Sequence, residues 1–249
     1  MSSEIRSEYV DINGLRAYQA LPSPPNAGRP SAGMLLLPMI TGIGEQIREF
    51  ADTIARETGV VALSWDPWHG KSSDDSSHDE LSKLLAQLDD DTAVAEQEKL
   101  LAHMRGNLGL ERVGVIGWCL GGRYAFILGG RNADLANVIA YHPTVTIPPA
   151  ANHKIDAIAY TARTAAPVLM AYPGKDSIVS RESFLALQEA LQSREAAPSI
   201  VHLYPEAKHG FSDKRRHNEQ ANADAFRLSW PQALDFIRET TRVAAQIPA

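Results

Sequence analysis

One short stretch of the chain constrains its fold more than any other. Residues 112–116 are rich in β-branched side chains and lead into Gly117-Trp118-Cys119-Leu120-Gly121-Gly122, after which a helix is predicted over residues 123–129. A strand, a tight turn and a closely packed helix in this order predict a nucleophile elbow, because small flanking residues permit the strained turn that presents the central side chain. That position usually holds serine, and here it holds Cys119. We therefore interpret Cys119 as a candidate nucleophile.

Cys119 is also the only cysteine of the chain, so no disulfide can form within it. A lone cysteine is commonly an inert buried residue, which is the alternative to a catalytic role. The position of Cys119 between Gly117 and Gly121, directly after an apolar run, favours the nucleophile.

The composition is that of an ordinary globular protein, with 44% hydrophobic and 22% charged residues among 249. We expect a single domain over residues 1–249, since α/β folds of this size commonly form one unit. The net charge of −6 argues against a nucleic-acid-binding surface, which needs a clustered basic excess. The first residues lack the features of a signal peptide, and the longest apolar run is too short to span a bilayer. We therefore expect a cytoplasmic monomer or homodimer without membrane contact.

Strands and helices alternate along most of the chain. Asn13-Gly14 joins two runs of strand character, 9–12 and 15–18, and predicts a hairpin turn, while residues 21–32 are expected to form a loop. From residue 34 onward, apolar runs alternate with helical spacing, which predicts a mainly parallel, doubly wound α/β sheet with helices on both faces. The expected strands are 34–37, 60–65, 112–116, 137–141, 167–172 and 199–204, and the expected helices are 45–58, 80–88, 93–105, 123–129, 221–245 and one around Phe184, Leu187 and Leu191.

Two strand ends carry the partners that a nucleophilic cysteine needs. The strand at 167–172 is followed by Pro173-Gly174-Lys175-Asp176, and the strand at 199–204 is followed by a loop that contains His209. Nucleophile, acid and histidine in this chain order are typical of α/β-hydrolase triads. In such a triad His209 takes the thiol proton, and Asp176 orients the imidazole and stabilises its positive charge. The alternatives are a turn or helix-cap role for Asp176 and an ordinary hydrogen-bonding role for His209.

The elbow also predicts an oxyanion hole. One donor is the backbone N–H of the residue after the nucleophile, Leu120, and the second comes from the loop after the first parallel strand. In this chain that loop is 38–44, and Ile40 is the expected donor. The glycines of the same loop also suit a tight turn between strand and helix, a role that is compatible with the first.

These motifs together resemble those of the dienelactone hydrolase (carboxymethylenebutenolidase) family of cysteine α/β-hydrolases. The resemblance rests on the elbow, on the acid and histidine loops, and on the Pro-x-Ile-x-Gly-Ile loop that begins at Pro38, and it extends over about residues 30–245. It implies an α/β-hydrolase fold and the cleavage of a small ester or lactone through an acyl-thioenzyme intermediate, with no metal or organic cofactor. The positions that fall on the family triad and oxyanion donors are Cys119, Asp176, His209, Leu120 and Ile40.

Two positions differ from the family pattern. Family members carry a glutamate before the isoleucine of the oxyanion loop, which helps to control the protonation of the cysteine; this chain has Met39, which cannot act as a carboxylate. We therefore expect Cys119 to depend on His209 alone. Family members also hold a substrate carboxylate with arginines, one of them four residues after the catalytic histidine, where this chain has Asp213. Both differences favour an alternative function, a carboxylesterase or thioesterase without dienelactone activity. A non-catalytic ligand-binding protein on the same fold is a third hypothesis.

Other side chains are candidates for binding the substrate. Arg215, between Lys214 and Arg216, could clamp a carboxylate, although a solvated surface run is the more common role for such a cluster. Lys71 and Arg123 are weaker candidates. Met39, Trp68, His142 and Phe211 follow strand ends or lie in the expected site loops, so they are expected to line the pocket, with simple packing as the alternative. A zinc site at His69 and His78 is not expected, because the spacing of ligands is irregular.

Overall fold

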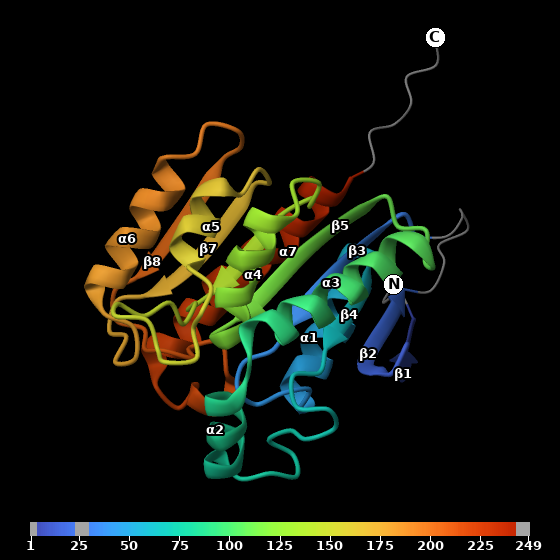
Figure 1. Cartoon of the computed structure of the whole chain (residues 1–249), viewed down its shortest axis with the longest axis horizontal. Coiled ribbons are helices and arrows are strands. Elements are labelled where there is room, and N and C mark those ends of the chain that lie inside the picture. Colours follow the sequence, from blue (N-terminus) through green and yellow to red (C-terminus); the bar gives the residue numbers. More distant parts are fainter. Residues whose placement is uncertain (1–3, 23–29, 243–249) are drawn as a thin grey trace.

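The computed structural model describes residues 4–22 and 30–242, and its strands form one eight-stranded sheet (Figure 1). The strands are β1 (Ile5–Ile12), β2 (Leu15–Pro22), β3 (Ala32–Leu37), β4 (Val61–Trp65), β5 (Arg112–Trp118), β6 (Val138–Tyr141), β7 (Val168–Pro173) and β8 (Ser199–Tyr204). Their order across the sheet is β1-β2-β4-β3-β5-β6-β7-β8. The hairpin β1-β2 is antiparallel and joins β4 in antiparallel fashion, whereas β4 to β8 run parallel. This is the predicted mainly parallel sheet with an N-terminal antiparallel hairpin.

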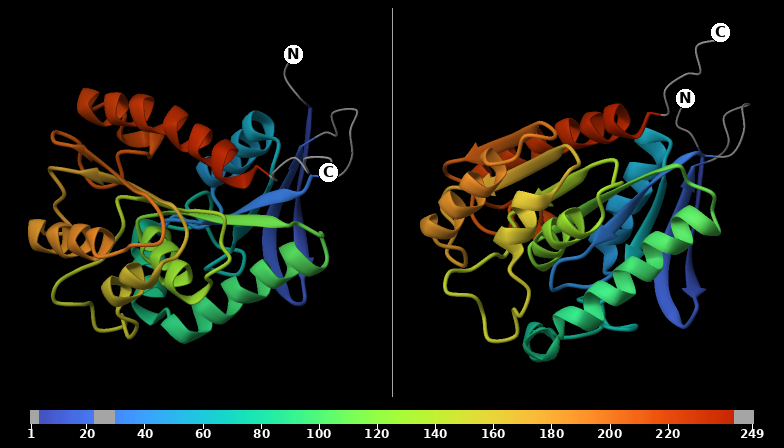
Figure 2. Two further views of the ribbon diagram at one scale, coloured as in Figure 1. Left: turned by 90° about the horizontal axis from the view of Figure 1, so that it is seen from above. Right: turned by 45° about the horizontal axis from the view of Figure 1, so that its top comes forward.

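Helices cover both faces of the sheet (Figure 2). They are α1 (Glu45–Thr58), α2 (His78–Gln87), α3 (Asp90–Gly106), α4 (Leu120–Arg131), α5 (Ala157–Arg163), α6 (Arg181–Gln192), the 3-10 turn η1 (Lys214–Arg216) and α7 (Gln220–Thr241). α1 and α7 pack together on one face, and α3, α4, α5 and α6 cover the other. Each face therefore has its own hydrophobic core, as expected for parallel strands that are buried on both sides.

Local sequence accounts for several elements directly. α1 has the predicted bounds, because its apolar side chains recur on one face and Gly59 ends the helix in the left-handed conformation, with φ of 73°. Asn13 and Gly14 both have positive φ and make the predicted hairpin turn, and the pairing extends from Ile12 with Leu15 to Ile5 with Pro22. The hairpin is longer than the sequence indicates, since the alternation of its outer residues is weak.

Three other elements differ from the prediction. α4 begins at Leu120, directly after Cys119, because Gly121 and Gly122 lie inside the helix instead of preceding it. α5 is not predicted; it has only seven residues and starts at Asp156, whose side chain accepts hydrogen bonds from two backbone amides. α7 ends at Thr241, and its predicted end at residue 245 lies outside the described residues.

The loops that carry the candidate site residues follow the carboxyl ends of the parallel strands β3, β4, β5, β6, β7 and β8, which lie at one edge of the sheet. Residues from distant parts of the chain meet there. None of the helices in the described residues is both long and apolar enough to cross a membrane.

Candidate active site

Cys119 lies at the turn between β5 and α4 with φ of 53° and ψ of −113°. A non-glycine residue rarely adopts this conformation, and it persists only where the surrounding structure imposes it. Close packing imposes it here. A Cβ atom on Gly121 would lie 1.8 Å from the carbonyl oxygen of Leu37, and one on Gly117 would lie 2.0 Å from the carbonyl oxygen of Gly121. The glycines therefore let α4 approach β3 and β5 closely enough to form the elbow.

Backbone hydrogen bonds tie the elbow to two neighbouring strand ends. The N–H of Cys119 donates to the carbonyl oxygen of Tyr141 at the end of β6, at 3.0 Å. The N–H of Gly121 donates to the carbonyl oxygen of Pro38 after β3, at 3.1 Å. The N–H of Thr144 donates to the carbonyl oxygen of Cys119, at 3.0 Å. These bonds fix the cysteine relative to the predicted oxyanion loop and to the segment after β6.

His209 and Asp176 are brought together as the sequence predicts. The Nδ1 atom of His209 lies 2.8 Å from Oδ2 of Asp176, and their side chains are 6% and 1% exposed. The other carboxylate oxygen, Oδ1, accepts hydrogen bonds from the N–H groups of Ile178 and Val179, so the acid also holds its own loop. The Nε2 atom of His209 is buried without a hydrogen-bond partner among the described residues, and His209 lines the same cavity as Cys119.

The charges of Cys119 and His209 depend on each other. Burial by itself raises the pKa of the Cys119 thiol, but His209, the Thr144 hydroxyl and the Leu120 amide together bring that pKa below its ordinary value. Burial by itself lowers the pKa of His209, but Cys119 and Asp176 outweigh it and raise that pKa to about 10. Each of the two groups therefore favours the charged form of the other, the thiolate of Cys119 and the imidazolium of His209.

Thr144 is a contact that the sequence does not predict. Its hydroxyl Oγ1 lies 3.1 Å from the Sγ atom of Cys119 and donates to it. Thr144 lies in the irregular segment after β6, where residue spacing gives no indication of side-chain direction. Because Met39 cannot stabilise or protonate the sulfur, Thr144 and His209 are the side chains that do so here.

A cavity of about 320 Å³ opens over Cys119. Met39 and Ile40 of the oxyanion loop line it, together with Leu85 of α2, Ile178 and Arg216. The helix α2 thus closes one side of the site, although the sequence gives no sign of this. The lining combines these apolar side chains with polar and charged ones, among them Asp213, and such a mixture suits a small organic ligand.

Of the five predicted substrate-binding residues, Met39 and Arg215 line this cavity, and Trp68, His142 and Phe211 do not. Trp68 is buried and its indole Nε1 donates to the carbonyl oxygen of Ile40 at 2.8 Å, so it supports the oxyanion loop. His142 and Phe211 are fully buried and pack with each other, with ring centroids 5.5 Å apart.

The candidate cations differ in whether they line the cavity and whether a carboxylate already binds them. Arg215 donates to both carboxylate oxygens of Asp213, which occupies the position of the family arginine. Arg216 lines the cavity, and its guanidinium has no hydrogen bond or ion pair to another described side chain. Arg123 is buried and bound to Asp90 at 2.6 and 2.7 Å, so it is not available to a ligand. Lys71 is exposed and lies outside the cavity lining.

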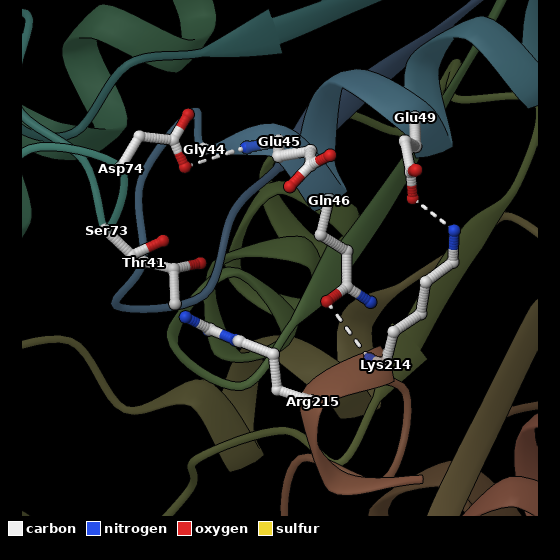
Figure 3. Close-up of a pocket in the computed structure, with 9 residues that line it drawn as sticks. All are labelled: Thr41, Gly44, Glu45, Gln46, Glu49, Ser73, Asp74, Lys214 and Arg215. Carbon is white, nitrogen blue, oxygen red and sulfur yellow. Dashed lines mark hydrogen bonds and ion pairs between the residues drawn. The ribbon is translucent and has the colours of Figure 1, made fainter.

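A second cavity, of about 360 Å³, is drawn in Figure 3 and shares lining residues with the first. The first turn of α1, Ser73 and Lys214 line it. Thr41 and Arg215 line both cavities, and Figure 3 shows the Arg215 side chain extended toward Thr41. Arg215 therefore lies between the two cavities and not deep inside the cavity over Cys119.

Within residues 4–22 and 30–242, no group of three or more His, Cys, Asp or Glu side chains is arranged to hold a metal ion. The groups that the described residues place at the site are the thiol of Cys119, the imidazole of His209 and the backbone N–H groups beside the sulfur.

The chain is similar to known proteins of one family over most of its length. The model of the dienelactone hydrolase family matches residues 15–241. A predicted carboxymethylenebutenolidase of Escherichia coli K12 is 25% identical, covering 91% of this chain and 83% of that protein. The carboxymethylenebutenolidase of Rhodococcus opacus is 23% identical, covering 85% of this chain and 82% of that protein.

Solved structures share the fold. A predicted dienelactone hydrolase from Klebsiella pneumoniae has a TM-score of 0.78 and 23% identity, covering 94% of this chain and 98% of that one. A dienelactone hydrolase-like promiscuous phosphotriesterase from metagenomic libraries has a TM-score of 0.74 and 18% identity, covering 96% and 99%. With the family model spanning nearly all of the described residues, the chain belongs to the dienelactone hydrolase family, a family of α/β-hydrolases that cleave ester and lactone bonds.

Proposed function

We propose that this protein cleaves a small ester or lactone with Cys119 as the nucleophile, His209 as the proton carrier and Asp176 as its orienting acid. The observation that carries the proposal is the elbow cysteine, held at positive φ in a cavity that it shares with a histidine bound to a buried carboxylate. A strained, half-buried thiol with a lowered pKa next to such a histidine is expected of a nucleophile and not of an inert core cysteine.

The first half of the reaction forms an acyl-thioenzyme. The Sγ thiolate of Cys119 attacks the carbonyl carbon of the substrate, and the carbonyl oxygen takes up the negative charge. The backbone N–H groups of Leu120 and Ile40 are the donors for this oxyanion. When the tetrahedral intermediate collapses, the C–O bond to the leaving group breaks, and the departing oxygen takes the proton from Nε2 of His209.

The second half releases the acid. His209, now neutral, accepts a proton from water through Nε2, and the resulting hydroxide attacks the thioester carbon. The C–S bond breaks and returns the thiolate of Cys119 beside the imidazolium of His209. Asp176 holds the imidazole in the required tautomer through its bond to Nδ1 and offsets the positive charge.

Cavity size and charge limit the substrate. A volume of about 320 Å³ suits a small ester or lactone. Arg216 is the cation best placed to meet a substrate carboxylate, because it lines the cavity while Arg215 is held by Asp213. A neutral ester or thioester is the second candidate substrate class, favoured by Asp213 at the position of the family arginine and by the exposed setting of Arg216.

The test is the turnover of cis- and trans-dienelactone and of a p-nitrophenyl ester of a short acid, measured on the wild type and on Cys119→Ala. We expect turnover of at least one substrate, lost in the alanine variant. Dienelactone turnover would establish the carboxylate-bearing lactone, and ester cleavage alone would establish the second class. Hydrolysis of neither substrate above the Cys119→Ala background would contradict the proposal and favour a ligand-binding protein.

A further inference from the structure

A second histidine lies directly against His209. His142 follows β6 and is fully buried, and its backbone φ is 36°, in the left-handed region that residues with a Cβ seldom enter. Apart from the hairpin residue Asn13 and the exposed His69, Cys119 and His142 are the non-glycine residues with positive φ in residues 4–22 and 30–242. Such conformations persist where other contacts over-determine them, and they concentrate at functional sites.

The contacts of His142 fix its ring on several sides. Its centroid lies 5.0 Å from that of His209, with an angle of 63° between the planes. Its Nε2 atom lies 2.7 Å from the hydroxyl oxygen of Ser212, and Ser212 in turn accepts a hydrogen bond from Gln46 of α1 through its carbonyl oxygen. The backbone N–H of His142 donates to the carbonyl oxygen of Ala171 in β7, at 2.8 Å.

We propose that His142 is a positioning residue for the reaction: its ring packs against His209 and holds the catalytic imidazole so that Nε2 faces the sulfur of Cys119. The inference rests on the proposed function, since it assigns His142 a role only through His209. His142 does not line the catalytic cavity, so contact with the substrate does not account for its placement.

The charge of the ring matters as much as its shape. The charged groups that face His142 are the imidazole of His209, from the loop after β8, and the guanidinium of Arg216, from η1; its other neighbours are the phenol of Tyr141, the ring of Phe211 and the hydroxyl of Ser212. Burial, followed by these two cations, lowers the pKa of His142 well below its ordinary value. A neutral aromatic ring attracts a neighbouring imidazolium, whereas a second cation would repel it.

Three variants separate the ring from its hydrogen bond. His142→Gln reaches toward Ser212 but has no ring, His142→Phe keeps a ring without the hydrogen bond, and Ser212→Ala removes only the hydrogen-bond partner. We would measure kcat and KM with whichever of the two dienelactones and the p-nitrophenyl ester the wild type hydrolyses, and the pH dependence of Cys119 alkylation by iodoacetamide, which follows the thiolate. A thermal unfolding curve checks that each variant is folded, and His142→Asn replaces His142→Gln if that variant does not fold.

We expect His142→Gln to lower kcat by about 10- to 100-fold with little change in KM, and to move the alkylation midpoint to higher pH, because the imidazolium is held less well. His142→Phe and Ser212→Ala should stay within about fivefold of the wild-type kcat and keep its alkylation profile. A His142→Gln enzyme with the wild-type kcat and alkylation profile would overturn this inference alone. An unperturbed thiol in the wild-type enzyme would overturn the proposed mechanism as well.

Discussion

Cys119 lies in a cavity where Met39 offers the sulfur no carboxylate. Three groups act on the thiol instead: the imidazole of His209, the hydroxyl of Thr144 and the amide of Leu120, all of which oppose the effect of burial on its pKa. These contacts favour the thiolate form of Cys119 before any substrate arrives. We therefore expect Cys119 to need no proton transfer to a carboxylate, and to react with alkylating reagents at a lower pH than an ordinary thiol does.

The pH dependence of the rate follows from these two groups. Below the pKa of Cys119, which lies under the ordinary thiol value of 9.0, the sulfur is protonated and cannot attack. Above the pKa of His209, raised to about 10, the imidazole has lost the proton that the leaving group needs. We expect kcat/KM to fall on both sides, with the alkaline limb near pH 10. A profile measured from pH 5 to 11, corrected with Cys119→Ala, checks this; an alkaline limb near neutral pH would contradict the ion pair.

The hydroxyl of Thr144 can be tested separately. In Thr144→Val the sulfur loses its donor at 3.1 Å, so the alkylation midpoint of Cys119 should rise by about one pH unit, with a lower kcat/KM. Thr146→Val is the matched control, because the Thr146 hydroxyl has no hydrogen-bond partner in the described structure and does not line the catalytic cavity. Equal alkylation profiles for the two variants would show that the Thr144 hydroxyl does not stabilise the thiolate.

The two neighbouring arginines offer a second matched pair. Arg216 lines the cavity without a side-chain partner in the described structure, whereas Arg215 is already bound to Asp213. We expect Arg216→Gln to raise the KM for a carboxylate-bearing lactone and to leave the KM for a neutral ester unchanged. The increase should be only about fivefold, because the Arg216 guanidinium is exposed and its charge is screened by solvent. Arg215→Gln should change the ratio of the two KM values less. A larger effect of Arg215→Gln than of Arg216→Gln on this ratio would indicate that Arg215 binds the substrate carboxylate.

At the level of elements, the elbow depends on how closely α4 approaches β3 and β5. Gly121→Ala places a methyl group where the carbonyl oxygen of Leu37 already lies, at 1.8 Å, so the helix must move or the fold must break. We expect a loss of about 3 kcal/mol or more in the free energy of unfolding, measured by urea denaturation. Gly106→Ala, at the end of α3 with open space around its Cβ position, should be neutral or slightly stabilising. Equal stabilities for the two variants would contradict the close approach.

The segment after β6 links the elbow to the histidine loop. Within three residues, His142 contacts the ring of His209 and Thr144 contacts the sulfur of Cys119. Because β6 lies between β5 and β7 in the sheet, its end falls between the strands that carry the nucleophile and the acid. The segment after β6 therefore contacts both Cys119 and His209.

At the scale of the whole molecule, the parallel sheet gathers the ends of β3, β5, β7 and β8 at one edge, and this gathering is predictable from sequence. Each strand is a short apolar run, and Asp176 and His209 follow their strands by only a few residues. The order of strands and the elbow motif then place the candidate triad without any knowledge of distances. The fold class and the layout of the triad follow from the same pattern.

Other features could not be predicted, for physical reasons. The position of His142 after a strand predicts that its Cα lies near the site, but its positive φ turns the ring behind His209 and away from the cavity. The direction of the Trp68 side chain could not be predicted either, because a tertiary contact decides it: the indole N–H donates to the carbonyl oxygen of Ile40. The seven residues of α5 are too few to show helical periodicity.

In the proposed reaction, Cys119 carries the acyl group during turnover. The most direct measurement is mass spectrometry of the protein quenched during hydrolysis of a slowly released p-nitrophenyl ester, followed by peptide mapping. We expect a mass increase equal to the acyl group on the peptide that contains residue 119 in the wild type, and no such increase in Cys119→Ala. An acyl adduct on another side chain, or hydrolysis by Cys119→Ala at the wild-type rate, would contradict it.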